Sequence, residues 1–252
     1  MDLELVRRIE GYAAQAWPAG EVAALQGWSL RYNSGITRRA NSVLAEAHGP
    51  EGNLAQKLGQ VEAWYAERNQ PARYQLCPAS EPPNLDLILA ARGYRATATT
   101  LVQVASLTTM VSNSGVIENI TLRCMDAPDG AWLQAYASAD GVRPADLDAR
   151  RAILGGITCP TCYLLVEVEG QGVATGLAVL DGKWAGLFCV ATHASWHRRG
   201  LAMCVVGSLA QWAMRQGATQ VYLQVMQENG GARALYARLG FATLYSYHYR
   251  ER

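Results

Sequence analysis

The stretch from Val190 to Ala202 constrains the possible folds of this chain more than any other segment. It reads VATHASWHRRGLA, so an apolar strand leads through a basic, glycine-containing loop into a long amphipathic helix. The first turn of a helix leaves backbone N–H groups without intrahelical partners and carries partial positive charge. An anion accepts hydrogen bonds from these N–H groups and is attracted by the positive charge. The segment therefore predicts a phosphate site at the start of the helix.

The side chains of the loop strengthen this prediction. Arg198 and Arg199 add full positive charge beside the helix, while Gly200 and Ala202 keep bulk away from its backbone. A pyrophosphate can then approach the amides closely. The loop has neither the G-x-x-x-x-G-K-S/T pattern of nucleotide hydrolases nor the G-x-G-x-x-G pattern of dinucleotide sites.

The loop matches Q/R-x-x-G-x-G/A after a strand, and in this it resembles the acetyl-CoA loop of the GCN5-related N-acetyltransferases, the GNAT superfamily. His197 stands where that family usually has Gln or Arg. The resemblance implies that acetyl-CoA is the cosubstrate and that backbone amides make most of the contacts, so we expect the exchange to be tolerated. The residues expected to bind it are Val190, Ala191, Thr192, His197, Arg198, Arg199, Gly200, Leu201 and Ala202.

A second segment carries the same resemblance. Residues 229–241 read NGGARALYARLGF and match N-x-x-A-x-x-L-Y-x-x-x-G-F. In GNAT proteins this segment lines the pantetheine arm and supplies a tyrosine beside the thioester sulfur. The resemblance, which covers roughly residues 117–250, implies that Asn229 and Tyr236 bind acetyl-CoA and that Tyr236 is catalytic.

The periodicity of the second half predicts a mixed α/β sheet of GNAT type, with the phosphate loop between its fourth strand and third helix. Strands are expected at 117–123, 163–169, 172–180, 184–192, 221–225 and 241–250, and helices at 127–139, 144–154, 201–216 and 229–239. For the first half we expect helices at 3–17, 52–68 and 84–92, strands at 73–77 and 96–107, and a hairpin of 27–32 with 36–44.

The first half shows signs of an internal duplication. Its loop at residues 48–52 has no arginine and contains Glu51, and Leu89 stands where a counterpart of Tyr236 is required. We therefore expect a degenerate, non-binding GNAT-like domain at 1–112 and a catalytic domain at 113–252, in tandem, with chance similarity as the alternative. The matching pairs are Gly52 with Gly200, Trp64 with Trp212 and Tyr74 with Tyr222, each 148 residues apart, and Gly93 with Gly240, 147 apart.

The composition excludes several classes of partner. A net charge of +1 and an isoelectric point near 7.6 provide no basic footprint for nucleic acid. No segment is apolar over the length of a membrane-spanning helix, and Asp2 and Glu4 stand where a signal peptide would be basic. We expect a cytoplasmic protein.

The cysteines and histidines do not suggest a metal site. Six cysteines in 252 residues form no dense disulfide framework, and reduced thiols are the simple reading. Cys159 and Cys162 have no second pair of ligands near them, so two loop thiols are favoured over half of a zinc site. The four histidines show no metal-ligand spacing.

Acetyl transfer to an amine requires a free lone pair, stabilisation of the oxyanion and a proton for the departing thiolate. Proton transfer from a tyrosine to the departing thiolate is uphill by only about 2 kcal/mol. Tyr236 is therefore the expected general acid. The base is left open among Glu167, Glu169, Asp181 and His193. The acceptor is expected to be the amine of a small molecule or peptide, attacking directly in a ternary complex. The alternative is a module that binds acyl-CoA without turnover.

Overall fold

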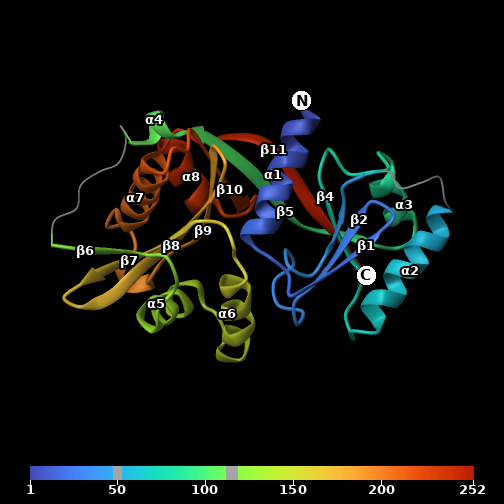
Figure 1. Ribbon diagram of the computed structural model, residues 1–252, viewed down its shortest axis with the longest axis horizontal. Coiled ribbons are helices and arrows are strands. Elements are labelled where there is room, and N and C mark those ends of the chain that lie inside the picture. The colour runs from blue at the N-terminus through green and yellow to red at the C-terminus, as the bar shows by residue number, and fades with distance from the viewer. Residues whose placement is uncertain (48–52, 112–118) are drawn as a thin grey trace. The chain divides into compact units, whose positions relative to one another are not determined.

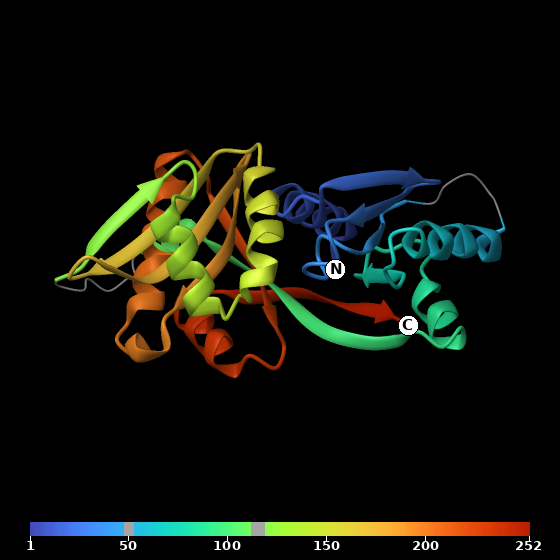
Figure 2. The same cartoon turned by 90° about the horizontal axis from the view of Figure 1, so that it is seen from below.

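The computed structural model describes residues 1–47, 53–111 and 119–252. Within these residues the chain forms two compact units, one of Met1–Leu101 with Tyr245–Arg252 and the other of Val102–Leu244. Figures 1 and 2 show the elements of each unit. The boundary predicted between residues 112 and 113 lies outside the described residues, so that division stays a prediction.

The first unit combines helices with a mixed sheet in the strand order β1-β2-β3-β4-β11-β5. Strands β3 and β4 are parallel, whereas β1 with β2, β2 with β3, and β4 with β11 are antiparallel. Its elements are α1 (Leu3–Ala16), β1 (Glu21–Leu25), β2 (Trp28–Tyr32), β3 (Val43–Ala45), α2 (Leu54–Ala66), β4 (Arg73–Leu76), α3 (Leu85–Ala91), the beginning of β5 (Arg95–Ser106) and the end of β11 (Ala242–Glu251).

The hairpin predicted from 27–32 and 36–44 has the predicted antiparallel pairing, between β2 and β3, but its returning strand covers only Val43–Ala45. Strand β2 pairs back to β1 through Gln26 and Gly27, whose φ angles of 46° and 81° suit a two-residue hairpin turn. Between β2 and β3 the chain is a loop that Asn41 holds: its Oδ1 accepts from the backbone N–H of Asn33 at 2.7 Å, and its Nδ2 donates to the Ile36 carbonyl at 2.6 Å. These side-chain bonds satisfy backbone groups that a strand would pair.

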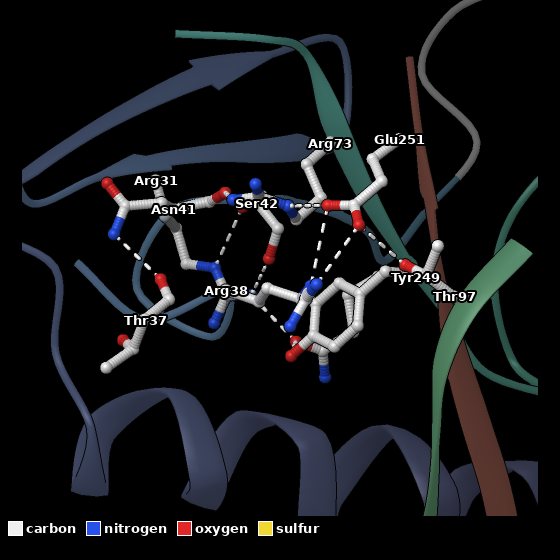
Figure 3. Close-up of polar contacts among 10 residues, drawn as sticks. Arg31, Thr37, Arg38, Asn41, Ser42, Arg73, Thr97, Tyr249 and Glu251 are labelled. Atoms are coloured by element: carbon white, nitrogen blue, oxygen red, sulfur yellow. Dashed lines mark hydrogen bonds and ion pairs between the residues drawn. The ribbon is translucent and has the colours of Figure 1, made fainter. Parts of the chain in front are cut away.

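A buried polar network occupies the interior of the first unit. The guanidinium of Arg31, 3% exposed, donates to Ser42 Oγ at 2.8 Å and to Gln75 Oε1 at 3.0 Å (Figure 3). Glu10 accepts from Gln75 Nε2 at 2.6 Å and from the Tyr245 hydroxyl at 2.7 Å. Because each buried charge has hydrogen-bonding partners, the network specifies how α1, β2, β4 and β11 pack together.

The second unit has the strand order β11-β5-β10-β9-β8-β7-β6, with β9 and β10 parallel. Figure 1 shows α7 on one side of strands β7 to β9 and α5 with α6 on the other. Its further elements are α4 (Leu107–Val111), β6 (Thr121–Met125), α5 (Gly130–Asp140), α6 (Leu147–Gly155), β7 (Thr161–Val168), β8 (Gln171–Asp181), β9 (Trp184–Thr192), α7 (Leu201–Arg215), β10 (Gln220–Met226) and α8 (Gly230–Arg238), with short 3₁₀ turns at Pro144–Asp146 and Ala194–Trp196.

Strands β5 and β11 each contribute to the sheets of both units. The end of β5 belongs to the second unit, where Gln103 Nε2 donates to Thr243 Oγ1 at 3.1 Å. The end of β11 belongs to the first unit, where it pairs with β4 between His248 and Leu76. Each sheet therefore contains a strand segment from the other half of the sequence.

Across the described ranges, the structure contains no helix long and apolar enough to cross a membrane.

Cys124 on β6 and Cys162 on β7 form a disulfide, so the expectation of reduced thiols is wrong for this pair. Their Cα atoms are 5.6 Å apart on neighbouring strands, a separation that a disulfide spans.

Candidate active site

The site predicted from the sequence lies where β9 and β10 separate. The parallel pairing of these strands runs from Trp184 opposite Gln220 to Leu187 opposite Leu223. Beyond that point β9 continues to Thr192 and β10 to Met226. The two strand ends thus leave backbone groups of β9 available to a ligand instead of to a neighbouring strand.

A bulge in β9 marks the same point. On its other edge β9 pairs with β8 at Phe188 opposite Leu177 and at Ala191 opposite Thr175, so the register shifts between them. Cys189 lies in the shifted segment with a φ of 51°, a left-handed conformation that is rare for a residue with a side chain. Such bulges bend a strand and redirect its backbone groups, which is the geometry expected for Val190, Ala191 and Thr192.

The N-terminus of helix α7 has the backbone geometry that the predicted anion site requires. Gly200 precedes the helix with a φ of 81°, and no side chain caps the helix start. The first intrahelical bond in this turn runs from Cys204 N–H to the Gly200 carbonyl at 3.0 Å. The amides of the preceding turn are therefore free to bind a phosphate.

A cavity of about 680 Å³ connects this helix start to α8. All the predicted cofactor-binding residues line it except Ala191 and Arg199. A role in binding stays a prediction for every one of these residues, including those that line the cavity. The residues that line the cavity are Val190, Thr192, Trp196, His197, Arg198, Gly200, Leu201, Ala202, Met203, Asn229, Gly231, Ala232, Ala234, Leu235, Tyr236 and Arg238.

Arg198 and Arg238 give the cavity its positive charge. Neither has a hydrogen-bonding or ion-pair partner among the described residues, so their charges are available to a bound anion. Arg199 differs, because its guanidinium lies over the ring of Trp196, 4.5 Å from the ring centroid. Arg238 was missed by sequence reasoning: it lies in the last turn of α8, outside the motif positions that carried the resemblance.

Tyr236 lies on α8 and is buried, with 8% of its surface exposed. Its ring packs edge-on against Phe241 with 5.6 Å between centroids. Burial raises the pKa of Tyr236 to about 12, so the hydroxyl is neutral at physiological pH. Complete proton transfer from Tyr236 to a thiolate whose thiol has a pKa of about 8.5 is therefore uphill by roughly 5 kcal/mol. This cost exceeds the value of about 2 kcal/mol that the sequence analysis gave for an unperturbed tyrosine.

His197 and Asn229 each stabilise the backbone around the cavity. His197 Nε2 donates to the Thr192 carbonyl at 2.8 Å and so connects the loop to the end of β9. Asn229 Oδ1 accepts from Ala232 N–H at 3.1 Å and caps α8. His197, which stands where the family usually has Gln or Arg, therefore has a local structural role in the loop.

None of the four candidate bases lines the cavity. Glu167 is engaged by Arg123, whose Nη1 is 3.2 Å from Glu167 Oε1. His193 Nδ1 accepts from Ser195 N–H at 3.3 Å, and Glu169 and Asp181 lie at the ends of hairpin turns. The geometry brings none of them to Tyr236. Within the described ranges no group of three or more His, Cys, Asp or Glu residues has the arrangement of a metal site.

The first unit repeats the order of strands and helices around this site. Its corresponding strand end, however, is occupied by the chain itself. β3, α2, β4 and α3 follow the order of β9, α7, β10 and α8, and Gly93 and Gly240 after the last helix both have a φ of 87°. At the end of β3, however, Glu81 N–H donates to the Ala45 carbonyl at 2.9 Å, and Trp28 Nε1 donates to the Glu81 carbonyl at 3.0 Å. The chain itself occupies this strand edge. The predicted degenerate loop at 48–52 lies outside the described residues.

Comparison with known proteins gives the family. The family model described as "Probable histone acetyltransferase Rv0428c C-terminal" matches residues 4–250. The uncharacterized N-acetyltransferase YobR of Bacillus subtilis (strain 168) is 29% identical over 246 residues, which are 97% of this chain and 98% of that protein.

Solved structures share the fold. A GCN5-related N-acetyltransferase from Kribbella flavida superposes with a TM-score of 0.74 at 16% identity, covering 97% of this chain and 94% of that one. A tandem GNAT protein from the clavulanic acid biosynthesis pathway, solved without AcCoA, gives a TM-score of 0.69 at 10% identity and covers 97% and 87%. The predicted mixed α/β fold of GNAT type is confirmed.

Proposed function

The chain belongs to the acetyltransferase family described as probable histone acetyltransferase Rv0428c C-terminal, and from this premise we propose that it transfers the acetyl group of acetyl-CoA to the amine of a small molecule or peptide. As a member of this family it is an acyltransferase of GNAT type. The observation that carries the proposal is the cavity lined by the end of β9, the start of α7 and α8, to which Arg198, Arg238 and Tyr236 all contribute.

Acetyl-CoA fits the chemistry of the residues around the cavity. The amides at the start of α7 and the unpaired charges of Arg198 and Arg238 suit its phosphates. The backbone of β9 after Leu187 has no partner in β10, so its groups are available to the amides of a pantetheine arm. Backbone N–H groups near Val190 would stabilise the oxyanion formed when the amine attacks the thioester.

The remaining step is the departure of the thiolate. The neutral Tyr236 hydroxyl donates a hydrogen bond to the sulfur as the carbon–sulfur bond breaks, which stabilises the developing charge without full proton transfer beforehand. The amine attacks directly, and the tetrahedral intermediate collapses to the amide and free CoA.

The proposal is tested by incubating the protein with acetyl-CoA and a pool of amines while free thiol is measured. We expect thiol release that depends on an amine and on the protein. Family membership favours this outcome over the alternative, a module that binds acyl-CoA without turnover. Binding of acetyl-CoA with no thiol release for any amine would support that module and contradict the proposal.

A further inference from the structure

The positive charges of the cavity come from two separate elements. Among the described residues that line it, Arg198 and Arg238 are the arginines and none is acidic. Arg198 precedes α7, whereas Arg238 lies in the last turn of α8. Acetyl-CoA also carries its negative charge in two places, a diphosphate and a phosphate monoester on the 3′ oxygen of its ribose. A phosphate monoester carries a charge of about −1.5 to −2 at pH 7.

Helical geometry separates Arg238 from Tyr236. Successive residues of an α-helix are about 100° apart around its axis, so two side chains that are two positions apart point in directions that differ by about 160°. Both residues nevertheless line the cavity. The cavity therefore follows the surface of α8 partly around the helix, and Arg238 faces a different part of it from Tyr236.

The face of α8 that ends at Arg238 leaves room for a ligand. Gly231, Ala234, Leu235 and Arg238 are three or four residues apart, which places them on one face of the helix, and all four line the cavity. A Cβ on Gly231 would meet only the Asn229 side chain, 3.9 Å away. Along this face the Arg238 guanidinium is the polar side-chain group that a ligand meets.

The Arg238 side chain is exposed and has no hydrogen-bond or ion-pair partner among the described residues. Arg233 on the same helix differs, because its Nη1 donates to the Gln227 carbonyl at 3.0 Å and it does not line the cavity. A guanidinium presents N–H donors in a planar arrangement that matches two oxygens of a phosphate. Arg238 therefore offers both a charge and directed donors to a phosphate group.

We propose that Arg238 binds the 3′-phosphate of acetyl-CoA, so that the protein selects a complete CoA ester over a donor that lacks this phosphate. The inference rests on the proposed function, in which the phosphates of acetyl-CoA bind at the start of α7 and at the two arginines. The diphosphate is assigned to the helix amides and Arg198, which lie together in one segment. The monoester is the anion that remains for Arg238.

An arginine in the last turn of a helix can also stabilise the helix, because its charge is attracted by the negative end of the helix dipole. That structural role would change the stability of the protein. It would not change the relative affinity for two ligands that differ only in the 3′-phosphate. The ratio of the two dissociation constants therefore distinguishes phosphate binding from a structural role of Arg238.

The test is calorimetric titration of the wild-type protein and Arg238→Gln with CoA and with 3′-dephospho-CoA. We expect the wild-type protein to bind CoA about 10-fold or more tightly than dephospho-CoA, and Arg238→Gln to bind both ligands within about threefold of each other. Equal affinities for the wild-type protein, a preference that persists in Arg238→Gln, or an equal loss for both ligands would overturn the inference. Failure of the wild-type protein to bind CoA at all would instead overturn the proposed function.

Two further variants provide matched controls. Arg198→Gln should weaken the binding of both ligands by the same factor and keep the preference for CoA, because both ligands contain the diphosphate. Arg233→Gln removes an arginine of the same helix whose side chain is bound to the Gln227 carbonyl, and it should leave both dissociation constants unchanged. A loss of the preference in Arg198→Gln but not in Arg238→Gln would assign the monoester to Arg198 and contradict the inference. Circular dichroism checks that each variant is folded.

Discussion

Gly186 on β9 lies opposite Tyr222 on β10, so close that a Cβ on Gly186 would stand 2.5 Å from the Tyr222 hydroxyl oxygen. Tyr222 is buried, and the Phe188 ring is equally near, at 2.6 Å from that Cβ position. The pair lies next to Leu187, the last paired residue before the strands separate. Packing around Gly186 thus fixes the point at which the cavity opens.

We predict that Gly186→Ala lowers the free energy of unfolding by about 1–3 kcal/mol, because the added methyl group overpacks the space beside Tyr222. Urea unfolding followed by fluorescence measures the change. Gly59→Ala is the control: nothing lies within 4 Å of its Cβ position in the middle of α2, and alanine favours a helix. An unchanged midpoint for Gly186→Ala would show that Tyr222 moves away freely.

Tyr236→Phe should lower turnover about 10- to 1000-fold while acetyl-CoA still binds. The substitution removes the hydroxyl but keeps the ring that packs against Phe241. Single-turnover kinetics and calorimetry measure the two quantities separately. Full activity when the chemical step limits the rate would remove Tyr236 from the mechanism.

The arginines of the cavity should differ in their contributions to binding. Arg198→Ala and Arg238→Ala should each weaken acetyl-CoA binding about 10-fold or more, since each removes a charge available to the phosphates. Arg199→Ala should change the dissociation constant less than about threefold, because Arg199 lies over Trp196 and does not line the cavity. Calorimetry at low salt measures all three. A larger loss for Arg199 than for Arg198 would reverse this assignment.

Glu251 should make the first unit sensitive to acid. Burial opposes its charge, but hydrogen bonds from Arg73, Arg38 and Thr97 outweigh this effect and lower its pKa to about 2 (Figure 3). The ionised group therefore stabilises the fold fully above its ordinary pKa of about 4.3, and this contribution disappears as the pH falls towards 2.

Glu251→Gln should be less stable than the wild-type protein at pH 7, and the difference should shrink between about pH 4.3 and 2. Urea unfolding at several pH values measures it. Glu228→Gln, at an exposed position with no ion pair among the described residues, is the control. A difference that stays constant down to pH 2 would refute the role of the Glu251 charge.

The sequence predicted the backbone structure at the start of α7 because that structure is local. Gly200 and the helix that follows lie in one continuous segment, and short-range rules for helix starts apply to it. The same holds for Asn229, which caps α8. The motif that contains Tyr236 predicted that this tyrosine lies on a helix. Its raised pKa could not be predicted, because burial causes it and burial depends on packing that no motif describes.

The parts that could not be predicted depend on residues distant in sequence. Arg150 and Tyr136, for example, belong to separate helices, and the hydrogen bond from Arg150 Nη1 to the Tyr136 hydroxyl leaves no distinctive local pattern. The contribution of β5 and β11 to the sheets of both units likewise leaves no periodic signal. A strand has the same alternating pattern whichever sheet it joins. The returning strand of the predicted hairpin is shorter than 36–44 because the side-chain bonds of Asn41 hold most of that segment as a loop.

The most direct test of the central claim is a single-turnover reaction in which acetyl-CoA labelled in the acetyl group meets excess protein and the best amine of the pool. Direct transfer at the cavity predicts that label appears on the amine at the rate of thiol release and in equal amount, with none bound to the protein. Thiol release without labelled amine, or label that accumulates on the protein first, would contradict it.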